Sequence, residues 1–367
     1  MPKKILFISH VANFQKFNWS LMKELKKNGW IVDYASSGEE TVQYCDHEYK
    51  IRIDRSPLSL ANIGAIFELR KLLTKNHYDL VHCHTPMGGV VARLANFLAG
   101  KYRTKIIYTA HGFHFYKGAP LINWLLFYPI EKILATVTTA IVTINQEDYQ
   151  LAKQKFKTRI FKIDGVGINL ERFMPITKSE KRALRKQYGY GDDDFIMIYV
   201  AEVIKRKNHL MIVRKIDKIL DKIPNLKFIF AGKDTNRYIY RQICKSNKID
   251  FLGYRKDVDK LFQLSDVAIT TSLQEGLATN IIEAMASGLP VICSNVRGHR
   301  ELIQNDENGY LFELNDDSEM IDNIVKIYNN HELCAKFSRN NIKMAKSYDQ
   351  AIATKKMMKI YNEVLND

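Results

Sequence analysis

Short apolar runs of strand length alternate with helical stretches along most of the chain, and no other feature constrains its fold as strongly. Because each crossover helix returns the chain to the same end of a sheet, strands in such an alternation pair in parallel. The runs form two series, 5–9, 31–35, 80–84, 106–109, 140–144 and 159–163, and then 195–200, 226–231, 249–252, 267–271, 290–294 and 310–312. The sequence therefore predicts an α/β protein with two Rossmann-like domains in tandem.

A polar, charged connection at about 175–194 separates the two series. The 367 residues also exceed what a single hydrophobic core usually holds. We therefore predict a first domain over 1–175 and a second over 185–345. Apolar residues at mostly helical spacing over 348–367 predict an amphipathic helix that packs back on the first domain.

The cysteines and apolar segments bear on the compartment of the chain. Its five cysteines are scattered and never form a Cys-x-x-Cys pair, which favours a reducing compartment and a role as small core residues. The apolar run between Lys4 and His10 is too short for a signal-peptide core. The longest apolar passage, 121–144, is interrupted by Pro129 and Glu131, and predicts a packed helix and a strand rather than a membrane span.

The net charge of +15 is uneven, because residues 1–175 carry +10 of it. This basicity suits an anionic partner such as nucleic acid, a phospholipid surface or a phosphorylated acceptor. A solvated lysine-rich surface is the alternative that charge alone leaves open. No nucleic acid is expected as a partner, because the chain lacks a known motif with interleaved aromatic and basic residues.

The stretch from Ser272 to Pro290 follows a predicted strand and opens a helix. A turn of this kind directs backbone N–H groups and the positive end of the helix dipole toward a ligand such as a diphosphate or a sugar hydroxyl. Glu275 in the loop then accepts hydrogen bonds from a sugar, and Glu283, one helical turn in, takes a ribose diol. Alternatively, Asn280 and Glu283 form a pair resembling a capping box, and Glu275 is merely exposed.

Three histidines stand at the ends of predicted strands. His82 and His84 share one face of a strand, a spacing that a metal pair can use, but no third ligand is evident. Satisfied strand-end histidines are therefore favoured. His111 lies just past another predicted strand and precedes Gly112, at a position where open α/β sheets place ligands.

The segment from Glu275 to Pro290 resembles the Glu-x7-Glu signature of retaining GT-B glycosyltransferases of family 4, whose usual form is Glu-Gly-Phe-Gly-Leu-Pro-x-x-Glu-Ala-Met-Ala-x-Gly-x-Pro-Val. The matching positions are Glu275, Gly276, Glu283, Ala284-Met285-Ala286, Gly288 and Pro290, and the departures are Leu277, Ala278, Thr279 and Asn280. Ala278 in place of glycine narrows the room above the loop. The resemblance implies two Rossmann-like domains that face each other across a cleft, and it implies donor-binding roles for Glu283, Gly276, Leu277, Ala278 and Thr279.

Other segments extend the resemblance over nearly the whole chain. Residues 79–86 and 108–118 are similar to the N-domain pattern of capsule and exopolysaccharide members of the family, and 165–173 resembles the segment leading into their interdomain connection. The resemblance implies that His111 approaches the donor sugar from the acceptor domain, and that Glu275 approaches it from the other side of the cleft.

The phosphate-binding cations depart from the family pattern, in which Arg is followed five residues later by Lys. Lys207 matches the lysine, whereas Glu202 occupies the arginine position, so Lys205 or Arg206 is expected to substitute. These cations lie at the C-terminal edge of a predicted strand, where they can neutralise a leaving diphosphate. From composition alone, the same residues form a basic solvated turn.

Two further turns resemble parts of the family's donor site. Tyr254 and Arg255 lie in a turn similar to one whose backbone reads the nucleotide base, and Arg297 lies in a loop similar to one that borders the sugar and phosphates. The acidic run 192–194 is not expected to be the metal-binding Asp-x-Asp of GT-A transferases, because that motif ends a strand and this run precedes one. The lone Gly-x-Gly at 165–167 is too weak for a dinucleotide site.

The resemblance implies a glycosyltransferase of the hexosyltransferase type. It would move a sugar, with retention of anomeric configuration, from a nucleotide-diphosphate sugar, expected to be a UDP-sugar, to a lipid-linked or glycan acceptor in cell-surface polysaccharide synthesis. Its catalytic residues would be His111, Glu275 and Lys207, and neither a metal nor a cofactor is expected. A UDP-sugar 2-epimerase of GT-B fold is the alternative, which needs no sugar acceptor.

The basic first domain predicts a cytoplasmic protein that docks peripherally on the inner face of the cell membrane. Its cations would meet anionic lipids and a polyprenyl-diphosphate-linked acceptor, while Phe113, Phe115, Trp124 and Phe127 dip into the interface. The alternative is a freely soluble enzyme whose aromatic residues are core. The cations expected to dock are Lys23, Lys26, Lys27, Arg70, Lys71 and Lys75.

Overall fold

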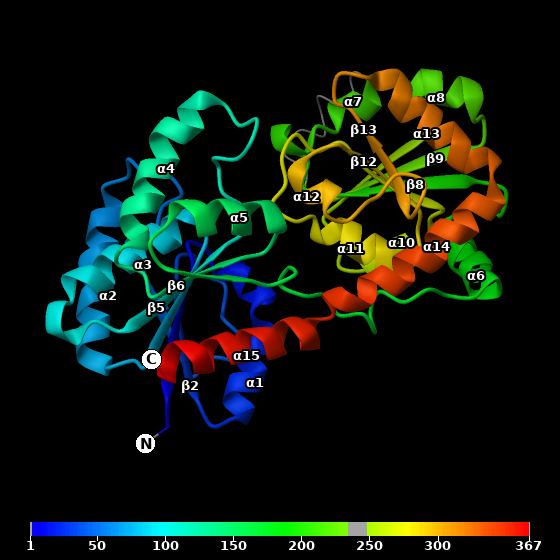
Figure 1. Cartoon of the computed structure of the whole chain (residues 1–367). Coiled ribbons are helices and arrows are strands. Elements are labelled where there is room, and N and C mark those ends of the chain that lie inside the picture. The colour runs from blue at the N-terminus through cyan, green and yellow to red at the C-terminus, as the bar shows by residue number, and fades with distance from the viewer. Residues whose placement is uncertain (1, 234–247, 367) are drawn as a thin grey trace. The chain divides into compact units, whose positions relative to one another are not determined.

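The computed structural model describes residues 2–233 and 248–366, which form two compact units (Figure 1). The first unit contains residues up to Gly167 together with the segment from Gln350, and the second contains Ile168–Asp349. The predicted first domain ended later, at residue 175. The difference arises because Ile168 forms a β-bridge with Asp349, and Phe173 packs in the core of the second unit.

The first unit is built on a seven-stranded sheet in the order β3-β2-β1-β4-β5-β6-β7, in which every pairing is parallel. One of these strands has no counterpart in the predicted series. It is β3, a short edge strand of sequence His-Glu-Tyr-Lys, which contains no apolar run from which a strand could be predicted. The strands are β1 Lys4–Ile8, β2 Ile31–Ser36, β3 His47–Lys50, β4 Leu80–His84, β5 Lys105–Ala110, β6 Ala140–Thr143 and β7 Arg159–Lys162.

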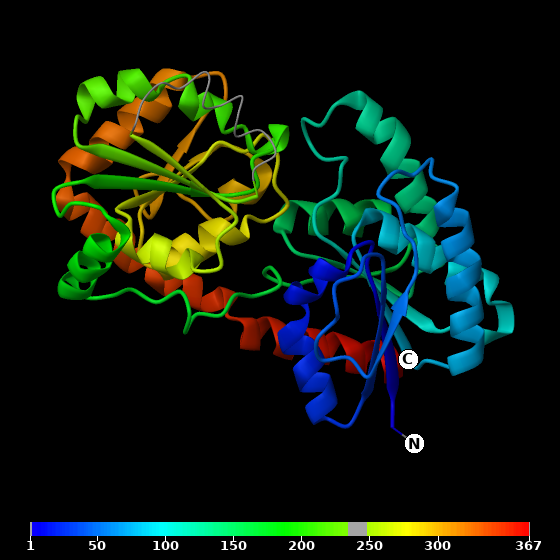
Figure 2. The same ribbon diagram turned by 180° about the vertical axis from the view of Figure 1, so that it is seen from behind.

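Helices cover both faces of this sheet. One face carries α2 Ala61–Asn76, α3 Pro86–Leu98, α4 Leu121–Ala135 and α5 Gln146–Lys155, whose apolar sides share a core with the strands. The other face carries α1 Trp19–Lys27 and, beside it, the C-terminal helix α15 Gln350–Asn366, as Figure 2 shows. The hydroxyl of Tyr361 on α15 lies 2.5 Å from His82 Nδ1, and Thr354 Oγ1 lies 2.9 Å from Ser20 Oγ on α1. These contacts attach the end of the chain to the first sheet.

The second unit has a six-stranded parallel sheet in the order β10-β9-β8-β11-β12-β13. Along β8, Met197 and Tyr199 pack into one apolar layer, while Ile196 and Ile198 pack into the layer on the opposite face. This doubly covered sheet explains why its strands read as continuous apolar runs. The strands are β8 Phe195–Val200, β9 Leu226–Ala231, β10 Ile249–Gly253, β11 Val267–Thr270, β12 Val291–Ser294 and β13 Gly309–Phe312.

The helices of the second unit complete both layers. Residues of α7, α8 and α13 share one core with the sheet, and residues of α10 and α11 share the other. The helices are α6 Lys178–Tyr188, α7 Leu210–Val213, α8 Ile216–Lys222, α10 Val258–Leu264, α11 Thr279–Ala286, α12 Arg297–Arg300, α13 Asp317–Asn329 and α14 His331–Ala345, with a 3-10 turn η3 at Lys205–Lys207. Two parallel sheets covered on both faces confirm the predicted α/β class.

Both sheets reverse their strand order beside the first strand of the series, at β1/β4 and at β8/β11. In open α/β sheets, ligands bind at the carboxyl ends of the strands next to such a reversal. Among residues 2–233 and 248–366, no helix combines the length and apolar character needed to cross a bilayer. The passage 121–144 forms α4 followed by β6, as predicted.

The cysteines follow the expectation in part. Cys83 and Cys293 are buried, and Cys334 packs partly buried against the core of the second unit. Cys45 is partly exposed and belongs to no core cluster of the described residues, so the core interpretation was wrong for Cys45. Cys244 lies outside the described residues.

Candidate active site

Two loops meet at the carboxyl edge of the second sheet, one after β8 and one after β11. The amide of Leu273 donates to the carbonyl of Arg206 at 2.8 Å, and Thr271 Oγ1 donates to the carbonyl of Asn208 at 2.8 Å. The hydroxyl of Tyr199 on β8 donates to the carbonyl of Lys207 at 2.7 Å. Backbone contacts therefore fix the position of the basic loop against the acidic loop.

Glu275 lies between two cations as a result. Lys207 Nζ is 2.6 Å from Glu275 Oε1, and Arg206 Nη1 is 3.2 Å from the same oxygen. The Glu275 side chain is only 8% exposed. Burial by itself raises the pKa of this carboxyl, but the charges of Lys207 and Arg206 outweigh burial and hold the pKa below its ordinary value. Glu275 is therefore ionised at neutral pH.

The acidic loop is also held from the side of α12. Arg297 Nε donates to the carbonyl of Glu275 at 3.3 Å. A Cβ added at Gly298 would lie 2.7 Å from the carbonyl oxygen of Gly276, so glycine permits this close approach of two backbones. Arg297 thus contacts the loop that carries Glu275.

Glu283 lies on α11, but its surroundings differ from those of a capping residue. The side chain of Asn280 donates to the carbonyl of Val200 at 3.0 Å, and the N-cap position is Ala278. The capping-box alternative for Asn280 and Glu283 is therefore wrong. Desolvation raises the pKa of Glu283 to about 8, against the opposing charge of Arg172. A protonated carboxyl can both donate and accept, which suits a pair of hydroxyl groups.

The N-terminus of α11 has no side-chain cap. Ala278 at the N-cap position has no side chain that could accept from the first-turn amides, and the helix follows directly on the loop of Glu275. Leu277 and Thr279 on either side are partly exposed. The predicted donor-binding residues of this turn therefore line one backbone segment that can bind a diphosphate.

Three other predicted donor-binding residues lie apart from the ion pair. Lys205 is exposed, as is Tyr254 at the end of β10. Arg255 donates a hydrogen bond from Nε to Oδ1 of Asp257 at 2.8 Å. This hydrogen bond is the main reason that the pKa of Asp257 lies well below its ordinary range. The structure brings Arg206, and not Lys205, into contact with Glu275.

His111 belongs to the first unit and lies at the carboxyl edge of that unit's sheet. Its Nε2 lies 3.1 Å from Nδ1 of His84. His82 has partners at both nitrogens, Thr109 Oγ1 at 2.7 Å and the hydroxyl of Tyr361. Burial lowers the pKa of His111 to about 4 and that of His84 well below its ordinary value, so both rings are neutral at physiological pH.

Sequence reasoning missed one contact in each unit. It assigned no role to Tyr199, and it treated His84 as a strand-end residue rather than a partner of His111. The contact between His84 and His111 could have been predicted from the pairing of β4 with β5. His84 pairs with Thr109, which is two residues before His111. Within the described ranges, no group of three or more His, Cys, Asp or Glu residues could hold a metal ion.

Comparison with known proteins agrees with these features. Residues 180–344 match the family described as Glycosyl transferases group 1, and residues 4–145 match the family described as Glycosyl transferase 4-like. The chain is 40% identical over 373 residues to EpsD of Bacillus subtilis (strain 168), named as a glycosyltransferase, and the match covers 100% of this chain and 98% of EpsD. The chain is a family 4 glycosyltransferase. It belongs to the capsule and exopolysaccharide type, which confirms the resemblance seen in the sequence.

Other proteins place this glycosyltransferase in a wider set. It is 30% identical to the UDP-Gal:alpha-D-GlcNAc-diphosphoundecaprenol alpha-1,3-galactosyltransferase of Escherichia coli, over 77% of this chain and 75% of that protein. The crystal structure of HepE from Anabaena in complex with UDP and glucose matches with a TM-score of 0.81 at 18% identity, over 98% of this chain and 100% of HepE. The fold of this glycosyltransferase is therefore GT-B, and the relatives do not favour an epimerase.

Proposed function

We propose that this glycosyltransferase moves a sugar from a UDP-sugar, with retention of anomeric configuration, to a polyprenyl-diphosphate-linked or glycan acceptor in cell-surface polysaccharide synthesis. The observation that carries the proposal is the ionised Glu275 held between Lys207 and Arg206 in the loop before α11, whose N-terminus has no side-chain cap. The name of the Escherichia coli relative, which contains UDP-Gal and diphosphoundecaprenol, supports the donor and acceptor classes.

In the proposed reaction, the bond between the sugar and the diphosphate breaks through an oxocarbenium-like state. The acceptor hydroxyl forms the new bond to the sugar from the same face, and its proton passes to an oxygen of the departing diphosphate. Lys207, Arg206 and the amides at the start of α11 stabilise the departing diphosphate, because each provides positive charge or a donor at a helix N-terminus. Glu275 accepts hydrogen bonds from the sugar, and Glu283 binds the ribose diol. Arg206 takes the place of the arginine that family members carry at the position of Glu202.

A donor assay tests the proposal. Incubation with a panel of UDP-sugars and GlcNAc-diphosphoundecaprenol should release UDP only when the acceptor is present, and NMR of the product should show the anomeric configuration of the donor. Because the proposed charge stabilisation comes from side chains and backbone amides, excess EDTA should leave the rate unchanged. A new UDP-sugar formed without acceptor would favour the 2-epimerase, and activity restored only by manganese would contradict metal independence.

We further propose that the protein docks on the cytoplasmic face of the membrane through its first unit, through a set of residues that keeps only some of those predicted. Phe113 and Phe115 are core residues, and Trp124 and Phe127 pack partly buried against the same core, so the aromatic set was wrong. Lys26 is paired with Asp46 on the other side of the sheet. The aromatic residues and Lys26 are therefore replaced in this proposal, whereas the predicted cations Arg70, Lys71 and Lys75 on α2 are exposed and are kept.

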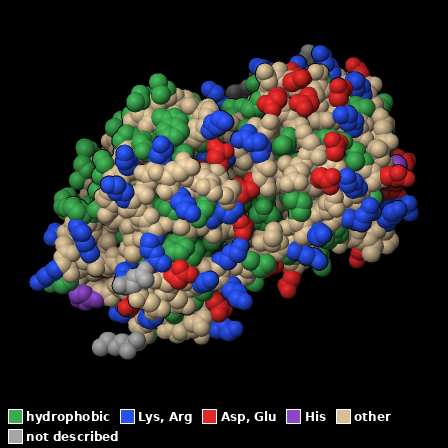
Figure 3. Space-filling model, in the orientation of Figure 1, with side chains coloured by type: hydrophobic (Ala, Val, Ile, Leu, Met, Phe, Trp, Pro, Cys, Tyr) green, Lys and Arg blue, Asp and Glu red, His purple; other side chains and the backbone are tan. Residues whose placement is uncertain are grey.

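Helix α4 provides an apolar face instead. Its inner side packs on the core, yet its outer side is also apolar, with Leu121 73%, Leu125 64% and Leu126 54% exposed. A helix that is apolar all round is normally buried, either in a protein core or in lipid. Figure 3 shows hydrophobic side chains gathered over α2, α3 and α4. The outer residues of α4 are Leu121, Ile122, Leu125, Leu126, Ile130 and Ile133.

The positive charges around this apolar face of α4 favour an anionic membrane surface as its binding partner. Exposed cations border the apolar residues on α2, on the segment after α3 and at both ends of α4, whereas Glu131 on α4 is buried against Arg93. Cations beside an apolar face suit an interface of anionic headgroups and acyl chains, each contributing about 1 kcal/mol near the surface. These cations are Arg70, Lys71, Lys75, Lys101, Arg103, Lys117 and Lys132.

Co-sedimentation with vesicles tests the docking face. The double variant Leu125→Ser/Leu126→Ser should bind anionic vesicles at least about tenfold more weakly, because each exposed leucine loses burial in the interface. Ile352→Ser on α15 is the matched control, since Ile352 is exposed on the other face of the sheet and should not matter. Lys117→Glu should weaken binding more than Lys26→Glu. Vesicle binding that is unchanged in the Leu125→Ser/Leu126→Ser variant, or that is equal for neutral and anionic vesicles, would contradict docking through α4.

A further inference from the structure

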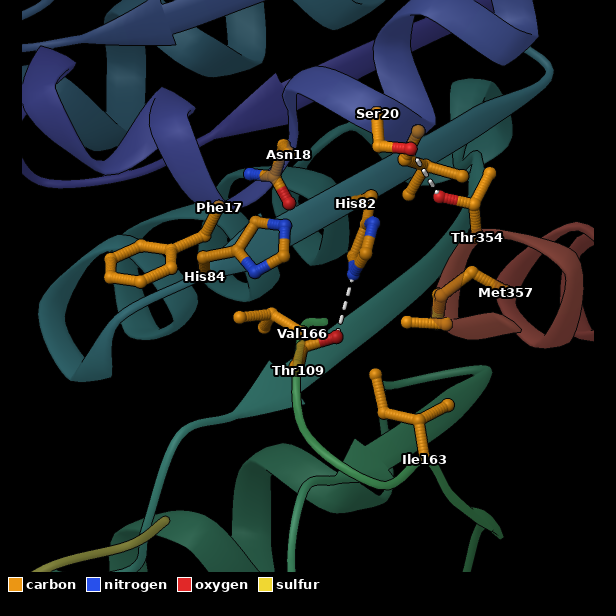
Figure 4. Close-up of a pocket in the computed structure, with 12 residues that line it drawn as sticks. Phe17, Asn18, Ser20, His82, His84, Thr109, Ile163, Val166, Thr354 and Met357 are labelled. Atoms are coloured by element: carbon orange, nitrogen blue, oxygen red, sulfur yellow. Dashed lines mark hydrogen bonds between the residues drawn. The ribbon is translucent and has the colours of Figure 1, made fainter. Parts of the chain in front are cut away.

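The first unit contains a pocket at the carboxyl edge of its sheet (Figure 4). It is small and partly open, with a cavity volume of about 20 Å³, and its lining comes from the 3-10 turn η1 Ala12–Phe17, from α1 and α15, from β4 and β5, and from the segment after β7. Polar side chains of the lining pair with each other, Ser20 with Thr354 and His82 with Thr109. By contrast, Nε2 of His84 has no hydrogen-bond partner among the described residues.

His84 is held rigidly in this wall. It is only 2% exposed, and its ring lies between those of Phe17 and His82 in Figure 4. Its ring centroid is 4.1 Å from that of His82 and 5.4 Å from that of Phe14. The next residue, Thr85, has a φ of 65°, a left-handed conformation that is strained for a β-branched side chain. Strain of this kind persists where surrounding contacts fix the backbone, and the amide of His10 donates to Thr85 Oγ1 at 3.2 Å.

The second nitrogen of His84 links this wall to the active-site histidine. Nδ1 of His84 lies 3.1 Å from Nε2 of His111. Both rings are neutral, and a neutral imidazole has one N–H donor and one acceptor nitrogen. In a bond between two such rings, the nitrogen that donates in one ring fixes which nitrogen of the other carries the proton. The tautomer of His84 therefore determines whether Nδ1 of His111 is a hydrogen-bond donor or an acceptor.

We propose that His84 is a positioning residue that holds His111 in one ring orientation and one tautomer through the Nδ1 to Nε2 hydrogen bond. The inference deepens the proposed function, because it rests on the role at the donor sugar that the family resemblance implies for His111. His84 does not touch the sugar in this proposal. Its unpartnered Nε2 faces the pocket, where a water molecule or a hydroxyl group completes its hydrogen bonding.

Two variants of His84 separate its two nitrogens. The amide of asparagine in His84→Asn lies where Nδ1 lies in histidine, so this variant keeps a partner for His111. The longer side chain in His84→Gln places its amide near the position of Nε2, so it keeps the pocket contact and loses the contact with His111. We expect His84→Gln to lower kcat about tenfold or more with little change in donor KM, and we expect His84→Asn to retain most of the turnover. Turnover retained in the Gln variant and lost in the Asn variant would overturn the proposal.

Nitrogen NMR of the histidine side chains tests the same bond without any turnover. With ¹⁵N-histidine labelling, the His111 signals are those that disappear in His111→Asn. The wild type and His84→Asn should show one tautomer of His111, and His84→Gln should show averaged nitrogen shifts. Unchanged His111 shifts in His84→Gln would overturn the proposal even if no sugar donor is found, so its failure is distinct from failure of the proposed function.

A reciprocal replacement covers the case in which the Gln variant does not fold. His111→Asn changes the partner of His84 at a partly exposed position. The nitrogen shifts of His84 should then move, because the shorter asparagine side chain does not reach the position of His111 Nε2 and Nδ1 of His84 loses its imidazole partner. If the His84 signals stay where they are in the wild type, the two rings are not coupled and the proposal is wrong.

Discussion

Glu275→Gln is expected to lower kcat by about 10²- to 10³-fold, with little loss of affinity for UDP. The carboxylate is ionised and nearly buried, and it faces the positive charges of Lys207 and Arg206. Loss of a group that stabilises the transition state in such a water-excluded site costs this much in enzymes. The two cations, freed from Glu275, remain available to the diphosphate, so UDP should bind as tightly or more tightly.

Steady-state kinetics and calorimetric titration with UDP measure the two effects separately. Lys207→Ala should weaken UDP binding and slow transfer together, because one charge-assisted contact to the diphosphate is lost. Glu283→Gln is the matched carboxylate control, since it should act mainly on donor affinity and not on turnover. Near wild-type turnover in Glu275→Gln, or weakened UDP binding as its main defect, would contradict the assignment of Glu275 to the sugar.

Gly298→Ala is expected to reduce activity about 100-fold and to lower the free energy of unfolding by about 1–3 kcal/mol. The added methyl would lie 2.7 Å from the carbonyl oxygen of Gly276 and 3.0 Å from that of Glu275. Both neighbours are backbone atoms, so α12 and the acidic loop must move apart. That movement displaces Glu275 from its position between the cations.

Gly64→Ala in α2 provides the control for this substitution. A Cβ at Gly64 meets nothing within 4 Å, and alanine in place of an exposed helical glycine should stabilise the protein by about 0.5–1 kcal/mol. Chemical denaturation and UDP release by both variants give the comparison. Full activity in Gly298→Ala would show that the acidic loop tolerates displacement and that its position does not limit the reaction.

Much of the fold was predictable from the sequence because buried parallel strands leave continuous apolar runs. The strands at 80–84, 195–200 and 226–231 were predicted with their observed bounds. The edge strand β3 was not predictable in the same way, because its four polar residues pair on one side only and bury little. Phe113 and Phe115 were predicted to contact the membrane but are buried in the core. The sequence alone does not distinguish an apolar side chain that faces the core from one that faces a membrane.

The sequence by itself determined the α/β class, the family and the residues of the acidic signature, because local periodicity and motif spacing depend only on residues that are close together in the chain. Only the tertiary structure decided that Lys207 and Arg206 meet Glu275 across 68 and 69 positions, that His84 pairs with His111 across 27, and that α4 exposes its leucines. These contacts depend on how separate strands align at one edge of a sheet and on which side of a helix packs. Both are set by burial against distant segments, and a local pattern does not contain that information.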